Sequence, residues 1–83
     1  MWVRKEMIAM QITLEAARVN AGYTQAEAAD LLDIHYQTLA KWEDDNSKMP
    51  YDKISKIEEI YKVPSKNIFF GKKNEFIRLL RGR

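Results

Sequence analysis

Residues 24–43 read TQAEAADLLDIHYQTLAKWE and contain two short helical patterns separated by one break. The first pattern begins at Thr24 with the capping-box order Thr-Gln-Ala-Glu, in which the threonine hydroxyl and the glutamate carboxylate each satisfy a free backbone N–H. The expected buried side of this helix is mostly small, which lets another helix approach closely; its members are Ala28, Ala29, Leu31 and Leu32.

The break falls at Asp33-Ile34, and a second helix is predicted from about Tyr36 to Asp44. Its apolar positions are Leu39 and Trp42, while Gln37, Lys41 and Asp44 point elsewhere. Two short helices joined by a tight turn, with small residues where they cross, are the elements of a helix-turn-helix.

Helical periodicity continues on both sides of this motif. A helix is predicted from about Ile12 to Ala21, and Gly22 suits the left-handed conformation beyond a helix C-terminus. Downstream, Pro50 marks the start of a helix that Val63-Pro64 closes. Ser65 is expected to cap a short fifth helix that ends at Gly71. A last amphipathic stretch, from Glu75 to Leu80, places Phe76, Ile77, Leu79 and Leu80 together.

The predicted fold class is therefore all-α, a compact bundle of about five helices with a helix-turn-helix and a C-terminal amphipathic extension. A chain of 83 residues makes one domain. We expect residues 1–11 to form an N-terminal extension, residues 12–71 the helix-turn-helix domain, and residues 72–83 a basic amphipathic tail.

Composition excludes several classes of protein. The chain has no cysteine, so it has no disulfide framework and no thiolate metal site. No apolar stretch approaches the roughly 20 residues that a membrane-spanning helix needs, and Met1–Glu6 lacks the pattern of a signal peptide. We therefore expect a cytoplasmic protein with no membrane partner. No nucleophile–base set, metal cluster or glycine-rich phosphate loop can be assembled, so we expect no enzyme activity, metal, cofactor or small-molecule substrate.

The charge distribution is more informative than the net charge of +2. From Lys66 onward a single acid, Glu75, faces six basic residues, which are Lys66, Lys72, Lys73, Arg78, Arg81 and Arg83. The segment from Glu27 to Asp45 is rich in acids instead. Clustered basic charge favours phosphate binding, although a solubilising surface is the alternative reading of this tail.

The chain resembles the XRE family of DNA-binding domains, which includes the phage repressors and Cro proteins, from about Leu14 to Gly71. Gly22-Tyr23-Thr24-Gln25 is similar to the family's entry to its second helix, and Thr38–Glu43 to the end of its recognition helix. Ala29 occupies the family's small-residue position. Pro50 and Ile60–Val63 also fall in register. The resemblance implies a lambda repressor-like fold and double-stranded DNA as the partner.

The resemblance also implies roles for individual residues. The helix from Tyr36 would enter the major groove by its N-terminal half, with Tyr36, Gln37 and Lys41 at base-reading positions. Gln25 would hold a phosphate together with the free N–H groups of its helix. His35 is read as a helix cap or a phosphate neighbour, and Asn46, Ser47 and Lys48 as contacts to the DNA backbone. An idle exposed position remains the alternative for the base-reading residues, and an ordinary first-turn residue for Gln25.

Arg18 and Glu43 are expected to pair across two helices, as the family's arginine and glutamate commonly do, with Arg18 also in reach of a phosphate. The chain departs from the family pattern at two glycine positions. Asp33 stands in the turn, where it must adopt the left-handed region, and Asp45 follows the recognition helix, with Asn46 expected to take the strained conformation.

The sequence thus predicts sequence-specific binding of double-stranded DNA by a small transcriptional regulator, a phage or mobile-element repressor. A homodimer is expected through the C-terminal apolar residues, which alternatively complete the core; they are Phe69, Phe70, Phe76, Ile77, Leu79 and Leu80. The alternative function is a protein-interaction module such as an antitoxin or a phage adaptor.

Overall fold

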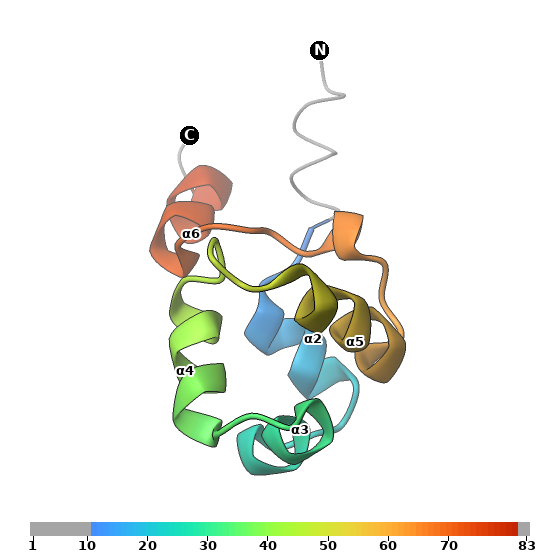
Figure 1. The fold of residues 1–83 in the computed structure, drawn as a ribbon. Coiled ribbons are helices and arrows are strands. Elements are labelled where there is room, and N and C mark those ends of the chain that lie inside the picture. Colours follow the sequence, from blue (N-terminus) through green and yellow to red (C-terminus); the bar gives the residue numbers. More distant parts are fainter. Residues whose placement is uncertain (1–10, 82–83) are drawn as a thin grey trace.

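The computed structural model describes residues 11–81, which form five α-helices and one 3₁₀ turn, with isolated β-bridges in place of any strand (Figure 1). The elements are α2 (Leu14–Asn20), α3 (Gln25–Leu32), α4 (Tyr36–Asp44), α5 (Tyr51–Tyr61), η1 (Ser65–Asn67) and α6 (Lys73–Arg81). The all-α class is therefore confirmed. The predicted N-terminal extension, apart from Gln11, and Arg83 of the basic tail lie outside the described residues.

The capping box predicted at the start of α3 is present, with both of its hydrogen bonds. The Thr24 backbone N–H donates to Oε1 of Glu27 at 2.9 Å, and the Glu27 N–H donates to Oγ1 of Thr24 at 3.1 Å. A threonine cap of this kind stabilises a helix by about 1 kcal/mol. Gly22, which precedes it, has a φ of 89°, the positive value expected beyond the end of α2.

The turn between α3 and α4 depends on a left-handed aspartate. Asp33 has φ 58° and ψ 46°, as its place in the turn predicted. The Ile34 N–H then donates to the Ala29 carbonyl at 3.0 Å, and Nζ of Lys53, on α5, donates to the Leu32 carbonyl at 2.8 Å. These bonds satisfy carbonyls at the end of α3 that the helix itself leaves free.

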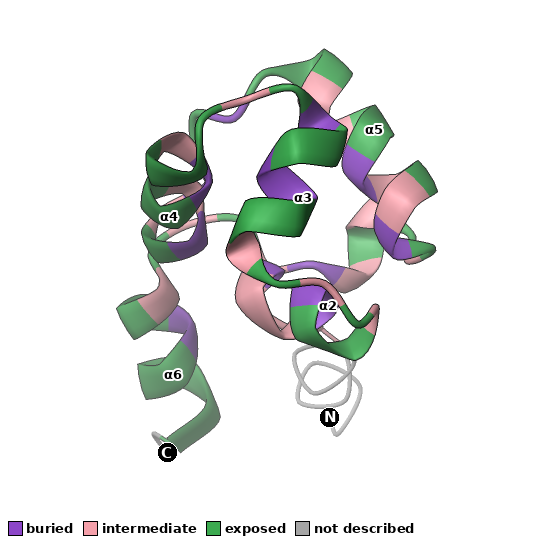
Figure 2. Cartoon of the chain, turned by 90° about the horizontal axis from the view of Figure 1, so that it is seen from below, coloured by how far each residue is buried: buried purple, intermediate pink, exposed green. Residues whose placement is uncertain are grey.

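The core lies between α2, α3, α4 and α5, and Figure 2 shows their buried residues turned inward. Its members are Leu14, Ala17, Ala28, Ala29, Leu32, Leu39, Met49, Ile57, Tyr61 and Ile68. Ala28 and Ala29 of α3 are buried, as predicted, and leave room for α4. Leu31 does not join them: it is 46 % exposed, because α5 and α4 cover the opposite side of α3. Trp42 is half-buried against the edge of the core.

Two helix boundaries differ from the prediction because segments far apart in sequence pair with each other. Ile12 is extended and forms a parallel bridge with Ile68, with its N–H donating to the Asn67 carbonyl at 2.8 Å. The Phe69 N–H donates to the Ile12 carbonyl at 2.9 Å. These bonds hold the segment after Asn67 extended, so the predicted fifth helix shrinks to one 3₁₀ turn. Ser65 does not cap it: the cap is Pro64.

The C-terminal apolar residues divide between the core and the surface. Phe76 is buried, and its ring lies 4.8 Å from the ring of Phe69. Ile77, Leu79 and Leu80 are exposed. α6 therefore buries one aromatic side chain against the bundle and leaves the rest of its apolar surface uncovered by the described chain. No helix within residues 11–81 is long and apolar enough to cross a membrane.

Candidate nucleic-acid interface

The outward side of α4 carries a continuous exposed stripe. Its members are Tyr36, Gln37, Ala40, Lys41 and Asp44. Leu39 and Glu43 lie on the opposite side and are buried, which fixes the rotation of the helix. All three predicted base-reading side chains are thus at the surface, and Tyr36 is 52 % exposed. Sequence reasoning left Ala40 out of the set, although its spacing of four residues from Tyr36 places it on the same face.

His35 begins α4 as its cap. Its Nδ1 accepts a hydrogen bond from the Gln37 N–H at 3.2 Å, so this nitrogen carries no proton in the capping state. The imidazole stacks on the ring of Tyr36, with 4.9 Å between centroids and 26° between planes. His35 therefore orients both the first turn of α4 and the side chain of Tyr36.

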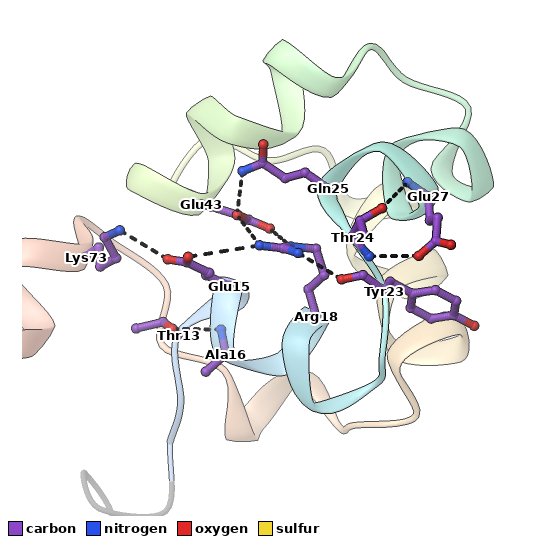
Figure 3. A network of polar contacts seen from close by, with 10 residues as sticks. All are labelled: Thr13, Glu15, Ala16, Arg18, Tyr23, Thr24, Gln25, Glu27, Glu43 and Lys73. Carbon is purple, nitrogen blue, oxygen red and sulfur yellow. Dashed lines mark hydrogen bonds and ion pairs between the residues drawn. The ribbon is translucent and has the colours of Figure 1, made fainter.

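A buried ion pair joins α2 to the last turn of α4 (Figure 3). Nε of Arg18 donates to Oε2 of Glu43 at 2.6 Å, and Nη1 donates to the Tyr23 carbonyl at 2.8 Å. The hydrogen bond to Glu43 raises the pKa of Arg18, against burial, which lowers it. The guanidinium of Arg18 thus forms its hydrogen bonds inside the bundle. The Arg18 side chain is only 11 % exposed, which disfavours a phosphate contact, and that role stays a prediction.

Gln25 connects the start of α3 to the same carboxylate. Its Nε2 donates to Oε1 of Glu43 at 2.9 Å (Figure 3). The N–H groups of Gln25 and Ala26, at the first two positions of α3, have no acceptor within the helix. They remain available to an anion, whereas one N–H of the Gln25 side-chain amide already donates to Glu43. The structure thus places the free end of α3 beside the last turn of α4.

Of the three residues in the loop after α4 that are predicted to contact the DNA backbone, two are exposed and one is buried. Ser47 and Lys48 are exposed. Asn46 is only 3 % exposed; its amide donates to the Phe69 carbonyl at 3.2 Å and its Oδ1 accepts from the Gly71 N–H at 2.8 Å. Asn46 therefore ties the loop to the segment before α6 and is withdrawn from the surface.

Asn46 also lacks the predicted left-handed conformation, since the non-glycine residues with positive φ among those described are Asp33 and Lys62. Asp45, in the position before it, is extended with φ −154°. Its Oδ1 accepts from the Ser47 Oγ at 2.7 Å and from the Ser47 N–H at 3.0 Å. These bonds, and then the charges of Lys72 and Lys48, lower the pKa of Asp45. The acid in this loop therefore has basic neighbours that offset its repulsion of a phosphate.

Comparison with known proteins agrees with this geometry. A helix-turn-helix family model matches residues 14–66, which is more than half of the chain. The chain belongs to the XRE family of helix-turn-helix proteins, a DNA-binding regulatory family. Neither a curated protein nor a solved structure matches the chain in the same comparisons.

Proposed function

We propose that the protein recognises a specific sequence of double-stranded DNA by inserting α4 into the major groove, and that it acts as a transcriptional repressor of phage or mobile-element type. The observation that carries this proposal is the exposed stripe of α4 beside the free end of α3. Gln37 offers an amide that fits adenine, Lys41 offers a donor for guanine, and Tyr36 can contact a thymine methyl group.

The two N–H groups at the start of α3 supply an anchor for a phosphate, because they combine free donors with the positive end of the helix dipole. The carboxylate of Glu43 holds both Arg18 and Gln25, which sets the anchor in register with the reading helix. Ser47 and Lys48, exposed in the loop after α4, add contacts to the backbone. His35 contributes by orienting Tyr36 and, through its free ring edge, by lying close to a phosphate.

A second candidate function, a protein-interaction module such as an antitoxin or a phage adaptor, is favoured by the exposed apolar residues Ile77, Leu79 and Leu80 on α6. The two functions differ in how binding responds to salt. Phosphate contacts release counterions, so affinity for DNA falls steeply as salt is added.

The deciding experiment selects bound duplexes from a random library with the full chain, and then measures the affinity of the chain for the recovered sequence and for a scrambled duplex. We expect a recovered consensus bound at least about a thousandfold more tightly than scrambled DNA. Recovery of no consensus, together with weak binding that is insensitive to salt, would overturn the proposed function in favour of the interaction module.

A further inference from the structure

The polar face of α6 lies beside the proposed reading helix but outside residues 14–66, the segment matched by the family model. α6 is held there by three contacts from separate parts of the bundle. Phe76 packs on Phe69, Lys72 forms an antiparallel bridge with Asp45, and Nζ of Lys73 lies 3.2 Å from Oε1 of Glu15, on α2. Its position is therefore set by side-chain and backbone bonds at its N-terminal end.

The outward residues of α6 follow from helix geometry. With 3.6 residues per turn, the positions most nearly opposite the buried Phe76 are Asn74, Arg78 and Arg81. All three are exposed. Neither arginine forms an ion pair with any residue of the described segment 11–81. Two free guanidinium groups are thus presented one helical turn apart.

This face of α6 points to the same side of the molecule as the exposed stripe of α4. α4 and α6 lie along one side in Figure 1, and Figure 2, turned by 90°, again shows them adjacent, with their exposed surfaces outward and their buried residues toward the bundle. By helix geometry Gln37 and Lys41 lie opposite the buried Leu39 of α4, and Arg78 and Arg81 lie opposite the buried Phe76 of α6, so both sets face away from the bundle. A duplex that meets α4 would extend past α6.

The charges between α4 and α6 permit one duplex to contact both helices. Lys72 and Lys48 lie near Asp45 and offset its charge. From residue 66 to residue 81 the sole acid is Glu75, which lines a shallow groove together with Arg78, Phe69 and Leu79 and therefore lies at one edge of the arginine face. The Asn74, Arg78 and Arg81 face itself contains no acid.

We infer that the Asn74–Arg78–Arg81 face of α6 is a second DNA-binding surface, which binds phosphates flanking the segment read by α4. The inference rests on the proposed function. It adds that α6 binds phosphate oxygens of the same duplex. Arginine suits this role because its planar fork can donate two parallel bonds to one phosphate. Phosphate contacts carry no sequence information, so α6 raises affinity for any duplex and leaves the preference for one sequence to α4.

The test compares wild type with Arg78→Gln/Arg81→Gln in the full chain. Affinity is measured for the selected duplex and for a scrambled duplex of equal length, from about 50 to about 200 mM salt. The slope of log affinity against log salt is negative, and each lost phosphate contact reduces its magnitude by about 0.9, so we expect the magnitude to fall by about 1.8. The affinity for both duplexes should fall by the same factor.

The matched control is Lys56→Gln/Lys62→Gln, which removes the same charge from exposed positions on α5 and directly after it, on the other side of the molecule in Figure 1. A second variant, Arg78→Lys/Arg81→Lys, keeps the charge and should retain most of the salt slope. Thermal unfolding of each variant checks that the fold is unchanged.

Equal slopes for the arginine variant and the lysine control would overturn the role of α6 while leaving the proposed function intact, provided that wild type still prefers the selected duplex. Absence of any duplex binding by wild type would overturn both. A fall in affinity confined to the selected duplex would also contradict the inference, because it would mean that α6 reads bases.

Discussion

Nε of Arg18 lies 2.6 Å from Oε2 of Glu43, and through this contact α2 holds the last turn of α4. The other carboxylate oxygen of Glu43 accepts from the Gln25 amide at 2.9 Å, which adds the start of α3. α2, α3 and α4 therefore meet at one carboxylate. Because the group is buried, its loss affects both the stability of the bundle and the placement of α4.

Removing one partner of this pair leaves the other charged and buried. We expect Arg18→Met or Glu43→Leu alone to lower the free energy of unfolding by about 3–5 kcal/mol. The double variant should lose much less than the sum, since neither charge is then unpaired. Urea unfolding followed by circular dichroism gives all four values. The control is Glu15→Gln, a half-exposed carboxylate 4.0 Å from Arg18 and 3.2 Å from Lys73, which should cost less than about 1 kcal/mol. Additive single effects would contradict the coupling.

Asn46 is expected to act on stability and not on DNA contact. Asn46→Ala leaves the Phe69 carbonyl and the Gly71 N–H without their partner, and each unsatisfied buried group costs about 1–3 kcal/mol. The neighbouring variant Ser47→Ala removes an exposed hydroxyl and should cost about 0.5 kcal/mol or less. The measurement is the urea midpoint of both variants. A midpoint for Asn46→Ala equal to that of wild type would show that its amide is not held inside.

The hydroxyl of Tyr61 is the buried side-chain group without a hydrogen-bond partner among the described residues. Tyr61→Phe deletes it while keeping the ring, so the variant should be more stable than wild type by about 1 kcal/mol. Burial, and then the charge of Glu43, raises the pKa of Tyr61 well above the ordinary value.

The raised pKa gives this prediction a pH dependence. Above pH about 10 the unfolded chain releases the tyrosine proton while the folded chain retains it, so wild type loses stability as the pH rises. Tyr61→Phe lacks this loss, and the stability gap between the two proteins should widen above pH about 10. Denaturant unfolding of both proteins at neutral and alkaline pH provides the measurement. A gap that stays constant or narrows would mean that the pKa of Tyr61 is not raised in the folded protein.

The elements that could be predicted from sequence are those specified by residues close together in the chain. The Thr24 capping box, the positive φ of Gly22 and the left-handed Asp33 each depend on a few adjacent positions. The Arg18–Glu43 pair spans 25 residues and was expected only through the family resemblance.

The features that sequence reasoning missed depend on contacts without a local pattern. Ile12 pairs with Ile68, and Asn46 bonds to residues 23 and 25 positions away. Hydrophobic periodicity cannot reveal either pairing, because it reports which face of an element is buried and not what covers it. The asparagine was assigned to the DNA backbone for the same reason: polar loop residues look alike in sequence whether they face solvent or a buried carbonyl.

Base reading by α4 predicts a selective effect for Gln37. Gln37→Ala should weaken binding to the selected duplex by about 1–3 kcal/mol and leave binding to scrambled DNA nearly unchanged. The side chain is exposed, so the fold should be unaffected. Ser55→Ala on α5, an exposed polar residue outside the proposed interface, is the control. Equal losses on both duplexes would remove Gln37 from the reading set.

The last prediction concerns assembly. One recognition helix reads only a few base pairs, so selectivity within a genome favours two copies on a near-palindromic site, with their reading helices about 34 Å apart. The exposed apolar residues of α6 are the surface available for that pairing, since Phe76 is already used inside the bundle. We expect Ile77→Gln/Leu80→Gln to shift the full chain from dimer to monomer in sedimentation experiments, and to remove cooperative binding of two copies to the selected duplex. Val19→Gln/Leu31→Gln removes two exposed apolar side chains from other helices and should leave the dimer unchanged. Two outcomes would each mean that α6 is not the dimer interface and that its apolar residues require another partner. In one, wild type stays monomeric in solution and binds the duplex as two copies without cooperativity; in the other, the α6 variant dimerises as wild type does.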